Sequence, residues 1–255
     1  MQLNEVKALI TGGVSGLGLA VARKVVAGGG QAVLLDINDE AGAAAEAELG
    51  GAVTYVRTDV TNEEGVTDAV KLAVDHMGMV NAAINCAGII GAGRVLGREA
   101  PMALEFFSKV IQVNLVGSFN VIKAAGAAME SNPPGEDGER GVIISTASVA
   151  ATDGQIGQAA YSASKAGIVG MTLPVAREYA RIGVRVNAVA PGIFWTPMVD
   201  GMPEHIQESL SASIPFPSRL GKPEDYAELV AHIMENGYLN GETIRLDGAV
   251  RLAPK

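Results

Sequence analysis

Cysteine and histidine are scarce in this chain. The single cysteine among 255 residues, Cys86, excludes a disulfide within the chain and favours a reducing compartment. We therefore expect a cytoplasmic protein. The three histidines lack the spacing of metal ligands, so we also expect no metal site.

Basic residues are outnumbered, and long apolar runs are missing. The 19 Lys and Arg face 28 Asp and Glu, which gives a formal net charge of −9. Because surfaces that bind nucleic acid are usually basic, nucleic acid is not expected as the main partner. No apolar run reaches the ~18 residues that a transmembrane helix needs, so no membrane span is expected. The first predicted strand begins near Glu5, which leaves no room for a targeting peptide.

Glycine is abundant instead. It supplies 32 of the 255 residues, well above the usual ~7%, which is typical of helices packed closely on a sheet. Short apolar runs, typical of buried strands, alternate with longer helical segments. This alternation predicts one α/β domain over residues 1–255, with a Rossmann-type, doubly wound sheet of seven mostly parallel strands and helices on both faces. The predicted strands are 6–10, 32–35, 53–57, 80–84, 142–144, 184–190 and 242–246, and the predicted helices are 19–27, 39–49, 63–77, 102–130, about 161–180 and 223–234.

The first predicted strand runs into a glycine-rich turn and then into a helix. Glycines let the backbone approach a phosphate closely, and the helix N-terminus offers free N–H groups. A merely tight turn explains the same glycines equally well. The candidate phosphate-binding residues are Thr11, Gly12, Ser15, Gly16, Leu17 and Gly18.

Acidic and small residues follow the next three predicted strands. Asp36, 18 residues after Gly18, is placed to accept both ribose hydroxyls of NAD. It would repel the 2′-phosphate of NADP, and no Lys or Arg in the glycine turn or immediately after Asp36 offsets this. The alternative is a helix-capping or turn aspartate. Asp59, followed by Val60, is placed to accept from the adenine amino group or to cap the next helix. The small residues Asn85, Ala87 and Gly88 would let the backbone lie against the cofactor.

The stretch from Val142 to Lys165 combines a strand, a loop and a helix. Tyr161 and Lys165 are four residues apart and therefore share one helical face. An ammonium about 4 Å from a phenol, at an effective dielectric near 20, is worth roughly 4 kcal/mol, or about three pKa units. This would make Tyr161 a base near neutral pH, with Ser148 positioning a substrate oxygen against it. Taken alone, the spacing also fits a helix whose Tyr and Lys face solvent.

Two further features stand out. Asn114 interrupts the predicted helix 102–130, where Asn is a poor helix former. It predicts either a helix distortion that frees a carbonyl for water or an ordinary hydrogen bond between helices. Apolar residues in the segment of about 193–217, which is rich in Pro and Gly near its start, predict a loop that covers an apolar substrate, or an oligomer contact. They include Phe194, Trp195, Met198 and Met202.

In the order and spacing of these motifs, the chain resembles the short-chain dehydrogenase/reductase family over essentially its whole length. One departure is Cys86, where the family often has a second Asn. The matching features are Thr11–Gly18, Asp59-Val60, Asn85–Gly88, Asn114, Ser148, Tyr161 with Lys165, and Pro191-Gly192 with Thr196.

The resemblance implies reversible hydride transfer between a secondary alcohol and the nicotinamide of NAD. Tyr161 would take the alcohol proton and Ser148 would orient the substrate oxygen. Lys165 would lower the Tyr161 pKa and hold the nicotinamide ribose. Asn114 would anchor a water that links Lys165 to solvent. A homotetramer is implied as well. The residues implied at the nicotinamide are Pro191, Gly192, Ile193 and Thr196.

Within the family, the chain looks like the type II 3-hydroxyacyl-CoA dehydrogenase branch. The likeness rests on 141–172, 215–221 and 240–249, whereas the region around Arg94 matches poorly. It implies a small-molecule substrate, an acyl-CoA or a similar apolar secondary alcohol, with Arg94 or Arg98 meeting the CoA phosphates. Alternatives are a 3-oxoacyl-(acyl-carrier-protein) reductase using NADPH, a hydroxysteroid dehydrogenase, and a non-catalytic binding or scaffold subunit. Asp36 argues against the first of these, and the complete motif set argues against the last.

Overall fold

Seven strands form one sheet in the computed structural model, which describes residues 1–195 and 204–254. Every pair of neighbouring strands is parallel. The predicted doubly wound sheet is confirmed, and it is wholly rather than mostly parallel. The strand order is β3-β2-β1-β4-β5-β6-β7. The strands are β1 (Lys7–Thr11), β2 (Gln31–Asp36), β3 (Val53–Arg57), β4 (Ala82–Asn85), β5 (Gly141–Thr146), β6 (Val184–Pro191) and β7 (Thr243–Leu246).

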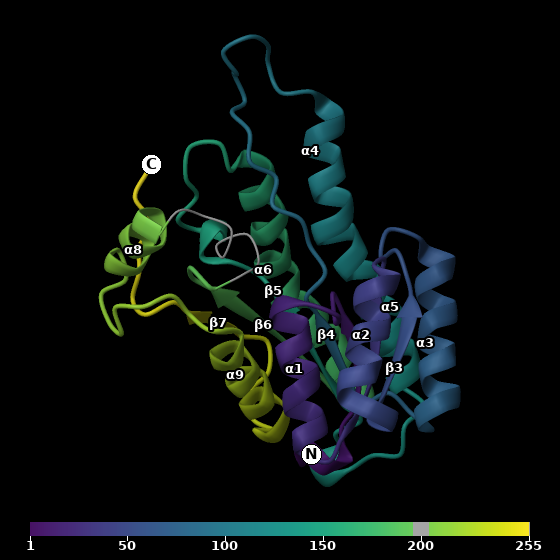
Figure 1. Cartoon of the computed structure of the whole chain (residues 1–255). Coiled ribbons are helices and arrows are strands. Elements are labelled where there is room, and N and C mark those ends of the chain that lie inside the picture. The colour runs from purple at the N-terminus through teal and green to yellow at the C-terminus, as the bar shows by residue number, and fades with distance from the viewer. Residues whose placement is uncertain (196–203, 255) are drawn as a thin grey trace.

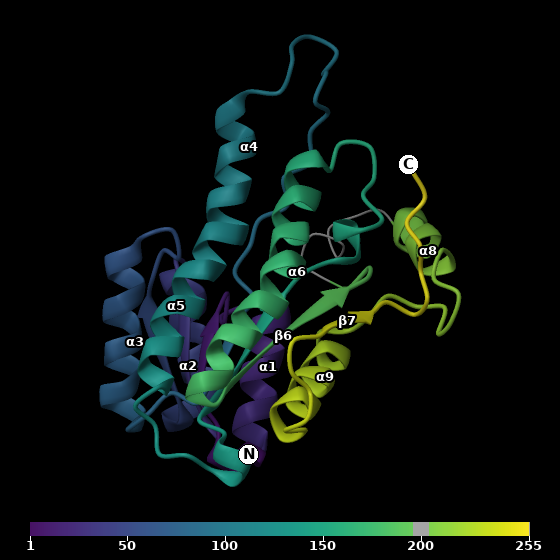
Figure 2. The ribbon, with the colours of Figure 1, turned by 180° about the vertical axis from the view of Figure 1, so that it is seen from behind.

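Helices cover both faces of the sheet. One layer holds α1, α2 and α9, which face the viewer in Figure 1, and the other holds α3, α5 and α6, which face the viewer in Figure 2. The helices are α1 (Gly16–Ala27), α2 (Asp39–Leu49), α3 (Glu63–Met77), α4 (Leu104–Ile111), α5 (Gly117–Met129), α6 (Ala159–Tyr179), α8 (Glu204–Ala212) and α9 (Pro223–Glu235).

Burial on both faces explains why the strands read as continuous apolar runs. In β1, Ala8 and Ile10 contribute to the core under α1 and α9, while Leu9 between them contributes to the core under α3 and α5. All residues of β6 are buried. The sheet therefore has two cores, one on each side.

The strand order reverses at β1, which has β2 on one side and β4 on the other. In open parallel sheets, such a switch point opens a crevice beyond the C-terminal strand ends, and ligands bind there. The glycine turn after β1, Asp36 at the end of β2 and the segment after β4 all meet at this place.

The predicted helix 102–130 is interrupted at Asn114, as expected. The helix α4 passes into a π-helical turn, Gln112–Val116, and then into α5. Such turns are frequent at functional sites. Although no uninterrupted apolar run of ~18 residues occurs, the helical segment Leu104–Met129 is long and apolar enough, by length and composition only, to cross a membrane, with a mean hydropathy of 1.2 over an 18-residue window. Half of this window is buried inside the fold, as in the core helices of globular domains.

The segment of about 193–217 is not a simple loop. It contains the helix α8, which the sequence did not predict. In Figure 1, α8 lies beside the C-terminal end of the chain, and α4 with the segment before it extends beyond the sheet. The predicted residues Thr196, Met198 and Met202 lie outside the described residues.

Candidate active site

One cavity of about 1000 Å³ lies at the C-terminal ends of β1 to β5. It brings together most of the predicted cofactor residues and both members of the Tyr-Lys pair. Its size suits a dinucleotide or a comparably large ligand. The predicted residues that line it are Gly12, Ser15, Gly16, Leu17, Gly18, Asp36, Asp59, Val60, Ala87, Gly88, Tyr161 and Lys165.

The glycine turn is shaped by close backbone contacts. Gly12 has φ +61°, and a Cβ there would lie 2.8 Å from the Ala87 nitrogen. A Cβ on Gly18 would lie 2.2 Å from the Gly12 oxygen, so no side chain fits either position. Ser15 precedes α1 without a side-chain cap, which leaves N–H groups of the first turn available to an anion. The turn therefore fits the phosphates of a dinucleotide.

Thr11 supports this turn without lining the cavity. Its side chain is buried, and its hydroxyl accepts from the backbone nitrogens of Cys86 (3.2 Å) and Ala87 (3.1 Å). Thr11 therefore ties the end of β1 to the segment after β4 and acts on a cofactor only through that segment.

Asp36 closes the second strand with a tight turn. Its Oδ1 accepts from the backbone nitrogens of Ile37 (2.8 Å) and Asn38 (3.1 Å). The N-cap of α2 is Asn38, so Asp36 does not cap the helix, whereas the turn role of the alternative interpretation agrees with these two hydrogen bonds. A cation does stand nearby, because Arg57 is the register partner of Asp36 on β3. This neighbour is not recognisable in the sequence, because Arg57 is brought beside Asp36 only by the pairing of β2 with β3.

Asp59 holds its own turn. Its Oδ1 accepts from the Thr61 backbone nitrogen (2.9 Å) and from the Thr61 hydroxyl (2.8 Å). The N-cap of α3 is Asn62, so the capping alternative is wrong for Asp59 as well. Its place in the cavity wall agrees with the predicted contact to an adenine.

The Tyr-Lys pair lies on the first turns of α6. Lys165 is buried, and its Nζ donates to the Thr146 carbonyl oxygen at 2.7 Å. The same nitrogen is 5.7 Å from the centre of the Tyr161 ring. Both side chains line the cavity, so the interpretation as a solvent-facing pair is wrong.

The predicted direction of the Tyr161 pKa does not hold for the protein alone. Burial raises the pKa of the phenol, and the hydrogen bond with Ser148 opposes this only in part. Burial lowers the pKa of Lys165 to about 8. Because both groups are desolvated, each favours its neutral form, and the assumed ammonium at about 4 Å does not decide the phenol pKa.

Ser148 stands beside Tyr161. It begins a short 3₁₀ turn, Val149–Ala151, and its Oγ accepts from the Ala150 nitrogen at 3.1 Å. This bond uses an acceptor position of Oγ. The hydroxyl proton is left for the Tyr161 oxygen in the protein alone, and for a substrate oxygen when one is bound.

Asn114 is fully buried and links three elements. Its Oδ1 accepts from the Ile89 nitrogen (2.8 Å), and its amide donates to the Ile89 oxygen and to the Ser164 hydroxyl (both 3.0 Å). The hydrogen bond between helices was one of the two alternatives. The Asn114 carbonyl accepts from the Ser118 hydroxyl at 2.8 Å. It is therefore not wholly free for water, although a carbonyl oxygen has a second acceptor position.

Several predicted residues lie away from the cavity. Asn85 is buried; its amide donates to the Ser145 hydroxyl at 3.1 Å, and its Oδ1 has no partner among the described residues. Asn85 thus joins β4 to β5 and does not face the cavity. Pro191 and Gly192 do not line it either, and a Cβ on Gly192 would lie 2.8 Å from the Asp247 Cβ.

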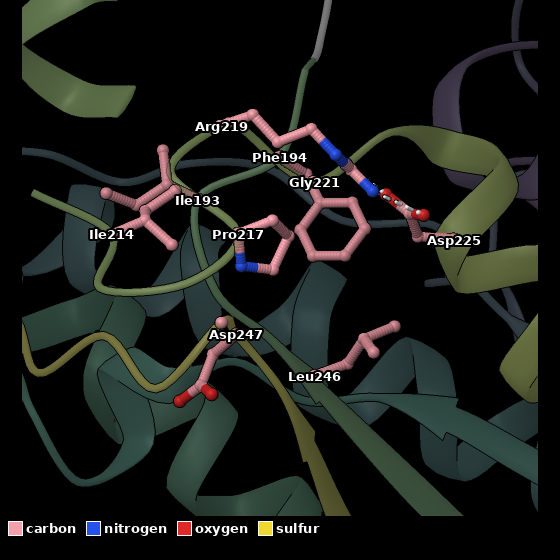
Figure 3. Close-up of a pocket in the computed structure, with 10 residues that line it drawn as sticks. Ile193, Phe194, Ile214, Pro217, Arg219, Gly221, Asp225, Leu246 and Asp247 are labelled. Atoms are coloured by element: carbon pink, nitrogen blue, oxygen red, sulfur yellow. Dashed lines mark hydrogen bonds and ion pairs between the residues drawn. The ribbon is translucent and has the colours of Figure 1, made fainter. Parts of the chain in front are cut away.

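Ile193 and Phe194 line a second, smaller cavity of about 150 Å³ (Figure 3). Phe194 is 7% exposed, and a Cβ on Gly221 would lie 2.6 Å from its ring. The Phe194 ring is thus packed into the core beside the smaller cavity and does not line the large one, so its predicted contact with a substrate stays a prediction. Trp195 is 38% exposed and lines neither cavity.

Sequence reasoning missed part of the cavity wall. Lys109, Gln112 and Val113 share one helical face, a spacing that marks them as neighbours but not as cavity residues. The others adjoin predicted motifs in the sequence, and only the folded structure tells which of them point inward. They are Leu35, Ile37, Thr58, Thr61, Cys86, Ile89, Ile90 and Thr146.

Among residues 1–195 and 204–254, no group of three or more His, Cys, Asp or Glu could hold a metal ion. Cys86 faces the Thr146 and Tyr226 hydroxyls, and burial raises the pKa of its thiol. It is therefore a poor nucleophile, as a buried filler would be.

The family model for "short chain dehydrogenase" matches residues 6–207. The chain belongs to the short-chain dehydrogenase family. It is 52% identical to a 3-hydroxyacyl-CoA dehydrogenase type-2 of Bos taurus, over 97% of this chain and 95% of that protein. It is 49% identical to the protein of that name in Drosophila melanogaster, over 96% and 97%.

A solved structure is similar along nearly the whole dehydrogenase. It is a 3-hydroxyacyl-CoA dehydrogenase type-2 from Mycobacterium avium, with a TM-score of 0.94 and 41% identity, covering 97% of this chain and 96% of that one. The protein is thus an oxidoreductase, and dehydrogenases of this family use NAD or NADP.

Proposed function

We propose that this dehydrogenase interconverts a 3-hydroxyacyl-CoA and the corresponding 3-oxoacyl-CoA, with NAD as its cofactor. The observation that supports this most is the single cavity that joins the glycine turn and Asp36 to Tyr161 and Lys165. The names of the similar proteins suggest the acyl-CoA, and the Asp36 carboxylate favours a ribose without a 2′-phosphate.

Each residue of the site has a separate role at the reacting alcohol group. Tyr161 takes the hydroxyl proton of the substrate, and Ser148 donates to the same oxygen and orients it. When bound at the glycine turn and Asp36, NAD would supply the hydride acceptor. Lys165 holds the nicotinamide ribose and, when charged, favours the phenolate. Asn114 fixes Ile89 and α6 around these groups through its three side-chain hydrogen bonds.

Apolar side chains support an acyl substrate. Ile89 and Ile90 line the large cavity, and Ile90 is 55% exposed, so it offers an apolar surface for a chain. Arg94 and Arg98 are exposed on the segment that follows. They are the cations we assign to the CoA phosphates. On the family resemblance, we further propose a homotetramer, which light scattering on the purified protein would test.

An activity panel tests the proposal. Purified protein is assayed with 3-hydroxyacyl-CoAs, hydroxysteroids and simple secondary alcohols, each with NAD and with NADP. We expect the highest kcat/KM for a 3-hydroxyacyl-CoA with NAD. A preference for NADPH and acyl-carrier-protein substrates would favour the reductase alternative. Tight RNA binding without turnover would favour a non-catalytic subunit.

A further inference from the structure

A cluster of one cation and two carboxylates stands at the predicted ribose site. Arg57 at the end of β3 is the register partner of Asp36 at the end of β2. Its Nη1 donates to the Ile37 carbonyl oxygen (2.6 Å) and to Asp39 Oδ2 (2.7 Å). Adjacent strands lie about 4.8 Å apart, so a guanidinium at this position reaches the side of the ribose site.

Asp39 is held from two sides. The Tyr55 hydroxyl donates to Asp39 Oδ1 (2.9 Å) and to the Asp36 carbonyl oxygen (3.1 Å), while Arg57 occupies Asp39 Oδ2. Burial and the hydrogen bond to Asp39 raise the pKa of Tyr55 to about 12, so its phenol remains a neutral donor. The turn 36–39 is thus fixed, with Arg57 turned toward Asp39.

The net negative charge of this cluster repels the 2′-phosphate of NADP. Asp36, Asp39 and Arg57 sum to one negative charge, and the 2′-phosphate of NADP would add up to two more. The Arg57–Asp39 pair is exposed, with side chains 62% and 65% accessible. With a neutral residue at position 39, the Arg57 guanidinium would lose its ion pair and keep only its hydrogen bond to the Ile37 carbonyl oxygen.

We propose that Asp39 withholds Arg57 from the ribose and thereby acts with Asp36 to select NAD over NADP. This rests on the proposed nucleotide site. It assigns a specificity role to Asp39, which does not line the cavity, and it makes Arg57 a latent ligand for a 2′-phosphate. Arginine binds phosphate through paired N–H groups, which suits that role.

Binding of adenosine fragments tests this without catalysis. Isothermal titration calorimetry compares ADP with adenosine 2′,5′-bisphosphate on the wild type, Asp36→Ala, and Asp36→Ala combined with Asp39→Asn. Wild type should bind ADP and not the bisphosphate. The double variant should bind the bisphosphate at least about tenfold more tightly than Asp36→Ala, which corresponds to about 1.4 kcal/mol.

Two controls separate the role of Arg57 from a change in net charge. Asp36→Ala combined with Glu40→Gln removes the same charge one residue further on and leaves the Arg57–Asp39 pair intact. Its affinity for the bisphosphate should therefore stay close to that of Asp36→Ala. Adding Arg57→Gln to the double variant should abolish the gain. Thermal unfolding verifies that every variant is folded.

The outcomes are distinct. The role of Asp39 and Arg57 would be overturned if Glu40→Gln raised the affinity for the bisphosphate as much as Asp39→Asn does. It would also be overturned if the higher affinity persisted after Arg57→Gln. In both cases the proposed nucleotide site would stand. Wild type that binds neither fragment would overturn the proposed nucleotide site and this inference with it. A gain that needs both Asp39→Asn and Arg57 supports the inference.

Discussion

The ammonium nitrogen of Lys165 lies 5.7 Å from the centre of the Tyr161 ring and is hydrogen-bonded to the Thr146 carbonyl oxygen instead of the phenol. The two groups thus share a desolvated wall of the cavity without forming an ion pair. In the protein alone, burial dominates both pKa values. On the proposed function, the phenol would become an effective base with added positive charge, which the nicotinamide ring of bound NAD would supply.

The charge state of Lys165 is expected to influence stability above neutral pH. The folded protein releases this proton at about pH 8, whereas the ordinary lysine value is 10.5. Between these values the unfolded chain binds more protons, so the Lys165 contribution to the free energy of unfolding rises with pH, by about 3 kcal/mol in total. Lys165→Met should lack this rise and be more stable than wild type below pH 8.

Urea unfolding without cofactor between pH 7 and 10 measures the difference. Lys71→Met, on the exposed side of α3, is the matched control and should keep the wild-type slope. Parallel pH curves for wild type and Lys165→Met would show that Lys165 titrates normally, contrary to its burial.

Tyr161→Phe separates chemistry from binding. The variant keeps the ring beside Lys165 and removes only the hydroxyl, so the cavity wall is preserved. Because general acid–base catalysis contributes about 10²–10⁴-fold, kcat should fall by at least about 100-fold. NADH affinity, measured by fluorescence, should stay near the wild-type value. Retained turnover would remove Tyr161 as the base.

Asn114→Ala should destabilise the fold through unpaired polar groups. It leaves the Ile89 backbone N–H and carbonyl oxygen without their Asn114 partner, whereas the Ser164 hydroxyl still donates to the Tyr161 carbonyl oxygen at 2.7 Å. Each buried group left unpaired costs about 1–3 kcal/mol. Ser118→Ala is the comparison: it removes one hydrogen bond to the Asn114 carbonyl, worth about 1 kcal/mol, and opens that oxygen to water.

The two variants also differ in catalysis. Both variants keep the Asn114 main-chain carbonyl. If a water on this oxygen relays protons from Lys165, Ser118→Ala should retain turnover, because the oxygen becomes more accessible. Asn114→Ala should lower kcat and shift its pH profile, because it removes the side-chain hydrogen bonds that hold Ile89 and α6 around the relay. A larger catalytic loss in Ser118→Ala than in Asn114→Ala would exclude this relay.

Local chemistry explains which elements could be predicted from the sequence. The bounds of α2 and α3 match the prediction because each helix follows an Asn cap, has two acidic residues in its first turn and is followed by a glycine. The distortion at Asn114 was predictable for the same local reason, since Asn disfavours helix interiors.

Features that depend on register or burial were not predictable. Arg57 stands beside Asp36 only because β2 and β3 pair in that register, and the sequence places the two residues 21 positions apart. The sequence predicts that Phe194 covers a substrate, whereas the structure packs its ring against Gly221. Desolvation of the Tyr161 phenol was not predictable either, because it depends on the folded surroundings. It raises the phenol pKa by more than the Ser148 hydrogen bond lowers it.

Gly18→Ala should disrupt the glycine turn. A methyl group there would meet the Gly12 oxygen at 2.2 Å, and this neighbour is backbone, so the turn itself must move. We expect lower stability and a loss of NADH binding, measured by thermal unfolding and fluorescence. Gly65→Ala in α3 is the control, because its Cβ has ordinary contacts with Asn62. It should stabilise the protein by about 0.4–1 kcal/mol.

Arg245 on β7 joins the C-terminal segment to the loop before Tyr161. Its guanidinium donates to Asp153 Oδ2 (2.7 Å), the Thr152 hydroxyl (2.9 Å) and Asp247 Oδ2 (2.8 Å). The Arg245 side chain is only 28% accessible, so its bonds are shielded from water. Thr152 directly follows the 3₁₀ turn that begins at Ser148.

Arg245→Met should therefore affect both stability and catalysis. Hydrogen bonds to charged groups contribute about 1.5–3 kcal/mol, and the variant leaves the Asp153 and Asp247 carboxylates without this partner, so a loss of that order is expected in urea unfolding. Because the loop carries Ser148 toward the substrate oxygen, kcat should fall while NADH affinity stays unchanged. Arg251→Met is the matched control: its side chain is 64% accessible and donates to Asp247 Oδ2 at 3.2 Å and to the Val250 carbonyl oxygen at 2.7 Å. Its stability should change by less than about 0.5 kcal/mol, and equal losses in the two variants would mean that Arg245 acts only through the C-terminal segment.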